Sequence, residues 1–294
     1  ETAMATTREL AKRYHDAEFL LNADAGGGTL DTASGKPVLY QIQAAEKTYA
    51  DFRIALTSPG GHSSEPGPDN AIYRLARVID RIAVHQFPPQ SNDITRASLR
   101  ALGARTPGAL GAAMTRFATH PDDGAAAATI SADPAYVGQI RTTCVATMLN
   151  GGHALNALPQ SASVNINCRI FPGTSVASVH DTLVKVIADK SATVTVQPPP
   201  PVASPASPLR KDVVAAVTAA VHHRFPGVEI VPGMSAGASD SMYFRNAGVP
   251  SYGIDAAFTK PDDTFAHGLN EKLPASEVEA GLEFWHRVLM QLAK

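Results

Sequence analysis

The chain has 294 residues, of which 44% are hydrophobic and 18% charged, and its formal net charge is −2. This length and apolar content are enough to bury one large core or two smaller ones. Lysine and arginine are scattered, so the sequence predicts no positive surface that would attract nucleic acid or an anionic membrane. No apolar run is long enough to span a bilayer. We therefore expect a folded α/β protein with neither a nucleic-acid partner nor a membrane span.

The first predicted elements alternate between helix and strand. A helix is expected at about 3–14 and a buried strand at about 18–23, in "AEFLLNAD". Further strands are expected in "PVLYQIQAAEK" and "YADFRIALT". In the last of these, Phe52, Ile54 and Leu56 share one face, as in a strand that is buried on one side.

The middle of the chain is predicted to hold an α+β segment. After the turn-forming stretch "SPGGHSSEPGPDN", a helix begins near Asn70, and residues 92–137 form a helical insertion. The strands "TTCVATML" and "SASVNINCRIF" follow, and the second alternates as strands do in an antiparallel sheet with one covered face. A helix, "SVASVHDTLVKVIAD", and a strand, "ATVTVQ", complete the segment. Cys144 and Cys168 are interpreted as two reduced core residues, with pairing between them as the alternative.

A proline cluster at 198–208, "PPPPVASPASP", marks a domain boundary, because proline fits neither a helix interior nor an internal strand. Beyond it, helices alternate with the strands "VEIV" and "PSYGI", and a final helix covers 276–293. This alternation is typical of a parallel sheet with helices on both faces. The sequence therefore predicts an α/β domain formed by residues 1–46 and 201–294, with an α+β domain inserted at 47–200.

Three polar residues near strand ends and turns are candidates for chemistry. His267 follows the strand "PSYGI" and Asp24 follows "EFLL", and ligands of α/β folds collect at the carboxyl ends of the strands. The simpler interpretations are a solvated loop residue for His267 and a turn former for Asp24. His62 follows two glycines and is explained locally as a structural turn residue.

Three further candidates lie on the alternating strand and in loops. Arg169 shares the polar face of its strand with Asn165 and Asn167, where an arginine is either solvated or a fork that binds a carboxylate through two parallel hydrogen bonds. Asn156, in "NALP", donates to a substrate carbonyl or only closes its turn. Ser239, in "GASDSMYF", does not fit the G-x-S-x-G elbow of a serine hydrolase.

Four motifs, "GGHSSEP", "NALPQSASVNINCRIFPG", "GASDSMYFRNAGVPSYGI" and "HGLNEKLP", resemble in this order the dinuclear zinc hydrolases, the family of aminoacylase, acetylornithine deacetylase and glutamate carboxypeptidase. The pattern "RTT…NALP…R-x-FPG" with "HGLNE" is most similar to the carboxypeptidase S and Gly-Xaa carboxypeptidase branch. The resemblance covers nearly the whole chain. It implies a three-layer αβα zinc-hydrolase domain, incomplete at its amino terminus, with an inserted α+β lid or dimerisation domain.

The resemblance also implies a centre of two zinc ions bridged by a water. The metal ligands in this chain would be Glu1, Asp24 and His267. The glutamate that acts as general base, and the remaining ligands, would precede Glu1. We therefore expect this chain to be the carboxy-terminal part of a larger enzyme, and its compartment is left open.

For the substrate, the resemblance implies that His62 stabilises the oxyanion and that Arg169 binds a carboxylate, with Asn156 and Ser239 completing the site. The substrate would be a small peptide or an N-acyl amino acid, cleaved by a metal-activated water at the amide bond next to a free carboxylate. Because the lid histidine comes from a partner subunit in many relatives, a homodimer through the lid is expected. The alternative is a metal-free, inactive scaffold or peptide-binding fragment.

Overall fold

The computed structural model describes residues 2–260, 263 and 268–293, and for residues 2–5 the backbone alone. The chain divides into two compact units. Unit 1 consists of residues 1–46, 91–130 and 204–294, and unit 2 consists of residues 47–90 and 131–203. This division differs from the predicted boundaries in one main respect, because the helical segment 91–130 belongs to unit 1 and not to the inserted unit.

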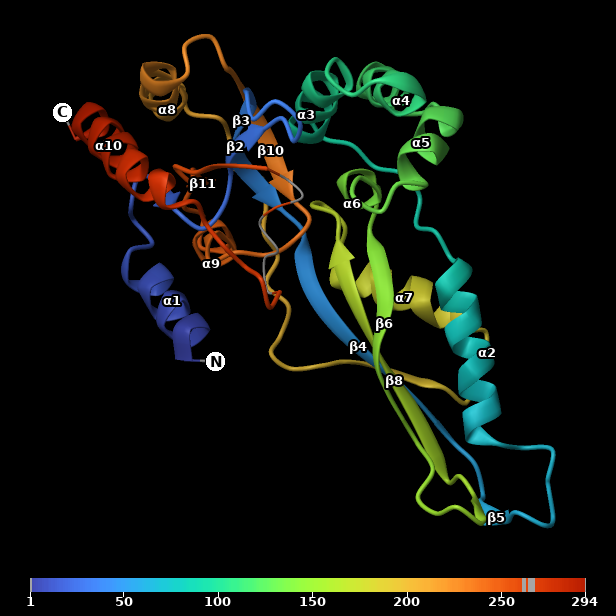
Figure 1. Ribbon diagram of the computed structural model, residues 1–294. Coiled ribbons are helices and arrows are strands. Elements are labelled where there is room, and N and C mark those ends of the chain that lie inside the picture. Colours follow the sequence, from blue (N-terminus) through green and yellow to red (C-terminus); the bar gives the residue numbers. More distant parts are fainter. Residues whose placement is uncertain (1, 261–262, 264–267, 294) are drawn as a thin grey trace. The chain divides into compact units, whose positions relative to one another are not determined.

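Unit 1 combines helices with a mixed sheet (Figure 1). Its helices are α1 (Thr2–Arg13), α3 (Asp93–Gly103), α4 (Gly108–Thr119), α5 (Gly124–Ser131), α8 (Lys211–Arg224), α9 (Ser241–Asn246) and α10 (Ala275–Leu292). Its strands are β1 (Leu20–Asn22), β2 (Gly27–Leu30), β3 (Pro37–Glu46), β10 (Glu229–Ser235), β11 (Ser251–Gly253) and β12 (Phe258–Thr259). Among the described residues, no helix is both long and apolar enough to cross a membrane.

The sheet of unit 1 has the strand order β1-β11-β3-β2-β12, with β10 also paired to β3. The pairs β1–β11, β3–β10 and β2–β12 are parallel, whereas β2 and β3 are antiparallel. The parallel sheet expected from the sequence is therefore mixed. The reason is the short turn between β2 and β3, closed by a hydrogen bond from the Gly35 amide to the Asp31 carbonyl, because a tight turn can join only antiparallel strands.

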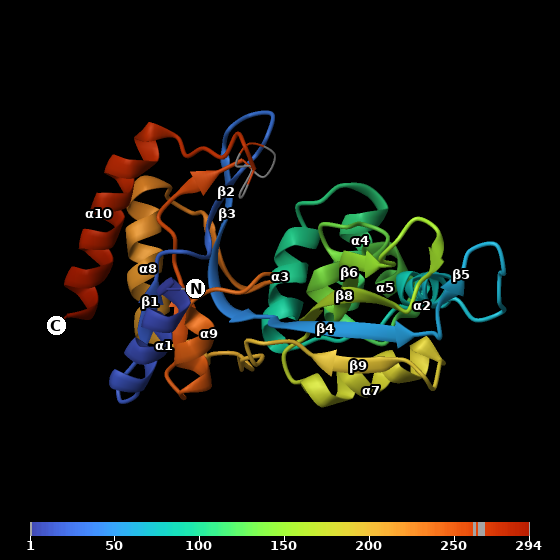
Figure 2. The same ribbon diagram turned by 90° about the horizontal axis from the view of Figure 1, so that it is seen from below.

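Neighbouring residues of β3 show which helices cover each face of this sheet. The Tyr40 ring packs against Phe284 of α10, with 5.9 Å between the ring centroids. Leu39, which points to the other face, packs in one cluster with Ala101 of α3. Figure 2 shows α8 and α10 on one side of β3 and α3 on the other. The apolar face of α3 thus places the segment 91–130 in unit 1.

Unit 2 is built around an antiparallel sheet with the strand order β6-β8-β4-β9. Its strands are β4 (Thr48–Thr57), β5 (Gly61–His62), β6 (Thr143–Gly151), β7 (Ala157–Leu158), β8 (Ser161–Ile170) and β9 (Thr193–Val196). Its helices are α2 (Ala71–Val84), α6 (Val137–Ile140) and α7 (Val176–Ile187). The strands β5 and β7 form a separate two-stranded sheet.

The core of unit 2 lies between this sheet and the helices α2 and α7. Phe52, Ile54 and Leu56 are fully buried there, which confirms the face predicted for them. The side chain of Asn70 accepts hydrogen bonds from the amides of Ile72 and Tyr73 and so caps α2 at its predicted start. The opposite face of β4 and β8 carries the polar residues of the alternating pattern.

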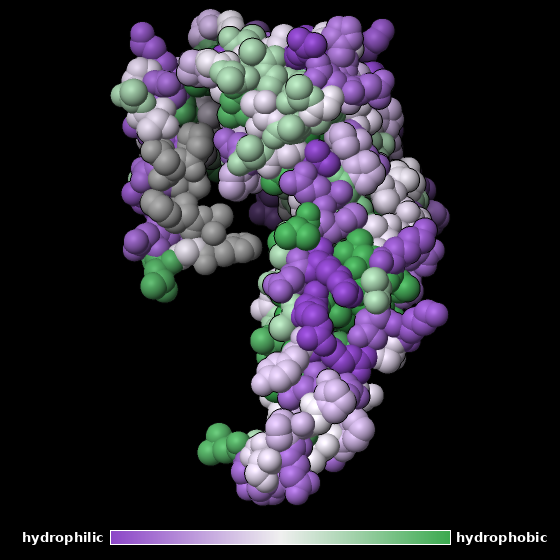
Figure 3. Space-filling view, turned by 90° about the vertical axis from the view of Figure 1, so that its right-hand side faces the viewer, coloured by the Kyte–Doolittle hydropathy of each residue, from purple (hydrophilic) through white to green (hydrophobic). Residues whose placement is uncertain are grey.

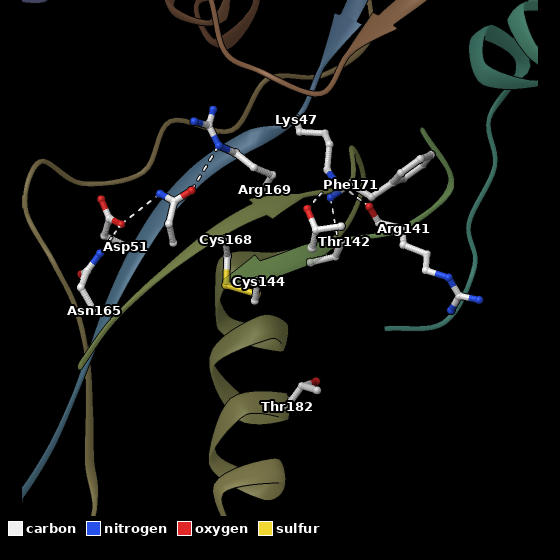
Figure 4. The surroundings of a disulfide bond; sticks show 12 residues. Lys47, Asp51, Arg141, Thr142, Cys144, Asn165, Cys168, Arg169, Phe171 and Thr182 are labelled. Atoms are coloured by element: carbon white, nitrogen blue, oxygen red, sulfur yellow. Dashed lines mark hydrogen bonds between the residues drawn. A yellow bond between two sulfur atoms is a disulfide. The ribbon is translucent and has the colours of Figure 1, made fainter. Parts of the chain in front are cut away.

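The two cysteines correct one interpretation from the sequence, because Cys144 and Cys168 form a disulfide instead of remaining reduced. Cys144 on β6 lies directly opposite Cys168 on β8, so the strand register brings the two sulfur atoms together. The alternation that placed Cys168 in the core was correct, but it gave no information on the neighbouring strand. In Figure 4 the disulfide lies between the sheet and α7.

Reduction of this disulfide should destabilise unit 2. The bond closes a loop with a sequence separation of 24, for which the loss of chain entropy on cross-linking corresponds to about 3 kcal/mol. We expect a reducing agent to lower the free energy of unfolding by about this amount in denaturant titrations. The double variant Cys144→Ala/Cys168→Ala is the control, because the same reducing agent should leave its stability unchanged.

Candidate active site

The structure brings His62 and Asn156 together at one end of unit 2. Gly61 and His62 of β5 pair with Leu158 and Ala157 of β7, and the amide of Ser63 donates to the Asn156 carbonyl at 3.0 Å. Both predicted residues are exposed there. Two predicted site residues that lie far apart in sequence are therefore neighbours in space.

The ring of His62 is oriented by Ser64. The Ser64 amide donates to Nδ1 of His62 at 3.3 Å, and the Ser64 hydroxyl lies 2.7 Å from the same nitrogen. Because Nδ1 accepts a hydrogen bond, the proton of the neutral ring is on Nε2. The exposed side of the ring is thus a hydrogen-bond donor, as the stabilisation of an oxyanion requires.

Arg169 occupies the polar face of β8 near the other end of the sheet. Its guanidinium stacks on the Tyr49 ring, 4.6 Å from the centroid, and its Nε donates to Oδ1 of Asn167 at 3.3 Å. Within the described part of the chain, its two terminal nitrogens have no hydrogen-bond partner. The side chain is therefore restrained at Nε and at one face of the guanidinium. The two terminal nitrogens, which could bind a carboxylate, remain available among the described residues.

His62 and Arg169 are too far apart in one chain to touch the same small substrate. Thr57 pairs with Ser161 at the end of the sheet where β5 and β7 lie, whereas Arg169 is eight residues further along β8. At about 3.3 Å per residue, this corresponds to about 26 Å. In Figure 1, β5 lies beyond the lower end of β4 and β8. The arrowhead of β8, which ends at Ile170, lies at the upper end.

Ser239 belongs to unit 1 and is bound to a buried carboxylate. Its amide and its hydroxyl donate to Oε2 of Glu46 at 2.6 and 2.8 Å. The other oxygen of Glu46 accepts from Arg245 at 2.7 Å and from Ser204 at 3.1 Å. Glu46 and Arg245 are both almost fully buried. A substrate could therefore reach the Ser239 hydroxyl only by donating a hydrogen bond to its oxygen.

Asp24 lies just beyond the carboxyl end of β1 in unit 1. Asp24 lies two residues beyond the end of β1, and Asp255 lies two residues beyond the end of β11. The two strands are parallel and pair Asn22 with Gly253, so the two aspartates follow neighbouring strand ends. Burial raises the pKa of Asp255, and the charge of Asp24 adds to this effect. The Asp24 carboxylate is exposed, and within the described residues it has no hydrogen-bond partner. Two carboxylates at neighbouring strand ends are a donor set that fits a divalent cation.

The other two predicted metal ligands, Glu1 and His267, lie outside the described residues. Among the described residues, no group of three or more histidine, cysteine, aspartate or glutamate side chains could hold a metal ion. Asp24 is therefore the one predicted metal ligand that lies within the described residues.

Lys47 is a buried amine close to Arg169. Its Nζ donates to the Arg141 carbonyl at 2.7 Å and to the Thr143 hydroxyl at 3.1 Å. Burial lowers the pKa of Lys47 to about 7, and the positive charge of Arg169 contributes to the shift. Lys47 is therefore only partly protonated at neutral pH, and Arg169 carries the permanent positive charge of the two.

Glu46, Lys47 and Asp51 were not singled out from the sequence, although a signal was present. Glu46 and Lys47 are consecutive charges between two apolar strand patterns, in "IQAAEKTYADF". Charged residues are rarely buried without partners, so charges inside predicted buried strands point to an ion pair or a hydrogen-bond network. The partners of these residues lie far away in sequence and could not be read from it.

Residues 44–195, just over half of the chain, match the family described as the peptidase dimerisation domain of M20 enzymes. This chain belongs to the M20 peptidase family. The matched region runs from the end of β3 into β9, so it includes nearly all of unit 2. The predicted family membership is thereby confirmed.

Curated relatives of this M20 chain are named as N-fatty-acyl-amino acid synthase/hydrolases and carboxypeptidases. Human N-fatty-acyl-amino acid synthase/hydrolase PM20D1 is 26% identical over 271 residues, which are 89% of this chain and 53% of that protein. Carboxypeptidase S of Saccharomyces cerevisiae is 29% identical over 191 residues, 62% of this chain and 33% of that protein. The chain spans about half the length of the first curated relatives that it matches.

Solved M20 structures share the fold. An M20 family metallo-carboxypeptidase, Sso-CP2 from Sulfolobus solfataricus, superimposes with a TM-score of 0.58 at 16% identity, covering 90% of this chain and 61% of that one. The predicted fold class, an α/β protein with an inserted lid or dimerisation domain, is confirmed by this likeness and by the family match.

Proposed function

We propose that this M20 chain is part of a metal-dependent hydrolase that cleaves an amide or peptide bond next to a free carboxylate. The observation that carries the proposal is the geometry of Arg169, whose guanidinium is held by Tyr49 and Asn167 while its two terminal nitrogens have no hydrogen-bond partner among the described residues. Such a fork matches a carboxylate through two parallel hydrogen bonds. The names of the relatives, an N-fatty-acyl-amino acid synthase/hydrolase and a carboxypeptidase, agree with a substrate of this class.

We further propose that one active site uses Arg169 from one chain and His62 with Asn156 from a second copy. The distance of about 26 Å along the sheet supports this arrangement, because a small peptide or N-acyl amino acid cannot bridge it. The Nε2–H of His62 would donate to the oxygen of the substrate carbonyl as that oxygen becomes negative. Asn156 would contact the same end of the substrate.

A homodimer through unit 2 is supported by an unpaired sheet edge. Among the strands that the structure describes, β6 pairs with β8 alone, and on this edge Val145, Met148 and Leu149 are between 57% and 66% exposed. On the neighbouring helix α2, Ile72 and Tyr73 are also exposed. Figure 3, which faces the side that carries α2, shows hydrophobic atoms between hydrophilic ones. An edge strand with exposed apolar residues is suited to pair with its symmetry-related copy.

We propose zinc as the metal, held in part by Asp24 together with Glu1 and His267. Carboxylate and imidazole groups are common zinc ligands, and the carboxylate pair at the ends of β1 and β11 provides negative charge for a cation. When bound, zinc supplies a water whose pKa is close to 7. Because the chain spans about half the length of its curated relatives, we propose that the general base and the remaining ligands lie in polypeptide outside these 294 residues.

Metal removal tests this function on the full-length protein. We expect a chelator to lower hydrolysis of N-acyl amino acids or dipeptides by about 100-fold or more, and added zinc to restore it. Asp24→Ala should lower the zinc content, whereas Asp181→Asn, on the exposed surface of α7, should not. Protein that contains no metal and hydrolyses none of these substrates would instead support an inactive scaffold or peptide-binding fragment.

A further inference from the structure

Two neighbours restrain Arg169, and both belong to the polar face shared by β4 and β8. Tyr49 lies opposite Arg169 in the strand register, and its ring supports one side of the guanidinium. Asn167 lies two residues before Arg169 and accepts a hydrogen bond from its Nε. The direction of the fork therefore depends on how Tyr49 and Asn167 are themselves held.

Asp51 binds Asn167 directly and also acts on Tyr49. Its Oδ1 accepts from Nδ2 of Asn167 at 3.0 Å and from Nδ2 of Asn165 at 2.8 Å. Hydrogen bonding to Asp51 raises the pKa of the Tyr49 hydroxyl, so this side chain also interacts with the carboxylate. Figure 4 shows Asp51 and Arg169 on the side of the sheet opposite the disulfide and α7.

The negative charge of Asp51 decides which way the Asn167 amide faces. With Nδ2 turned to Asp51, the amide oxygen is turned to Arg169, which can only donate. A flipped amide would place its oxygen beside the carboxylate and its NH₂ group beside the guanidinium, and both contacts would be repulsive. The carboxylate thus fixes the amide, and the amide fixes Nε of Arg169.

We propose that Asp51 is a positioning residue that sets the substrate-binding direction of Arg169 through Asn167, with Tyr49 as the second support. This inference rests on the proposed function, in which Arg169 binds the substrate carboxylate. Asp51 does not itself touch the substrate. Its effect is on selectivity for a free carboxylate, because a fork must be aligned to make two hydrogen bonds at once.

The variant Asp51→Asn tests this inference, because it removes the charge and keeps the size. On the full-length enzyme, kcat and KM are measured for the best N-acyl amino acid or dipeptide substrate and for its C-terminal amide. We expect KM for the free acid to rise about tenfold, with little change in kcat and no change for the amide. A merely structural role would change the kinetics of both substrates equally, and that result would overturn the inference.

Two further variants keep the test decisive. Asn167→Leu removes the intermediate amide and should give the same tenfold loss of acid-over-amide selectivity. Arg53→Gln is the matched control, because Arg53 lies on the same face of β4 but donates to Ser163 instead of Asn167. The selectivity of Arg53→Gln should equal that of the wild type, and the unfolding transition of each variant shows whether it is folded.

Arg169→Met separates failure of this inference from failure of the proposed function. If Arg169→Met retains acid-over-amide selectivity, the carboxylate role of Arg169 is wrong. If Arg169→Met loses selectivity but Asp51→Asn and Asn167→Leu keep it, the carboxylate role stands and the positioning role is wrong. In the double variant Asp51→Asn/Arg169→Met, we expect no selectivity loss beyond that of Arg169→Met alone.

Discussion

Replacement of Arg169 by methionine is expected to lower kcat/KM for a free-acid substrate by about 100-fold and to leave the C-terminal amide of that substrate unaffected. The two hydrogen bonds that the terminal nitrogens of Arg169 would make to a carboxylate are charge-assisted, and together they correspond to about 3 kcal/mol. Since each 1.4 kcal/mol is a factor of ten, this energy gives the expected loss. Methionine retains much of the apolar stem that packs on Tyr49, so the fold should be retained.

Arg169→Lys is the matched variant for this prediction. It keeps the positive charge but replaces the planar fork by a point charge, so an intermediate loss of selectivity is expected. Steady-state kinetics on the acid and amide pair provide the measurement. An equal loss for both substrates in Arg169→Met would show that the residue does not bind the carboxylate.

Replacement of His62 by alanine is expected to lower kcat by about 100- to 1,000-fold with little change in KM. Ser64 holds the ring so that its Nε2–H faces outward, and a donor to a developing oxyanion acts mainly in the transition state. His62 is exposed on the small two-stranded sheet of β5 and β7, so its replacement should change the free energy of unfolding only a little. Comparison of kcat, KM and the unfolding midpoint for wild type and variant checks this prediction.

His153 provides the control for His62, because it is another exposed loop histidine of unit 2. His153→Ala should keep full activity. Ser64→Ala should lower kcat by a smaller factor than His62→Ala, since it removes one of the two contacts that orient the ring. A His62→Ala enzyme with wild-type kcat would exclude the oxyanion role.

Much of the fold could be predicted from local patterns. Alternation along β4 and β8 correctly separated the core face, with Phe52, from the polar face, with Arg169. The helix start at Asn70 followed from capping chemistry. The helical segment 91–130 was expected within the inserted domain, because nothing in its composition indicates that α3 packs with Leu39 of β3.

Only those features of the candidate site that lie within a single strand could be predicted from the sequence. The place of Arg169 on the polar face was accessible because Asn165, Asn167 and Arg169 recur at every second position of one strand. The contribution of Asp51 was not, because it depends on the register of β4 against β8, where Asp51 lies opposite Asn167. The disulfide depended on the same kind of information, the register between Cys144 and Cys168. Pairing across strands is tertiary information that a local pattern does not contain.

Arg169 of one chain and His62 of a second copy are proposed to serve the same active site. The most direct test is a heterodimer of full-length Arg169→Met and His62→Ala chains, co-expressed with two different affinity tags and purified through both. Each parent homodimer should be nearly inactive. In the heterodimer, one of the two symmetric sites combines an intact Arg169 with an intact His62, so about half of the wild-type activity is expected. A heterodimer as inactive as its parents would contradict the account, because each site would then need both residues from one chain.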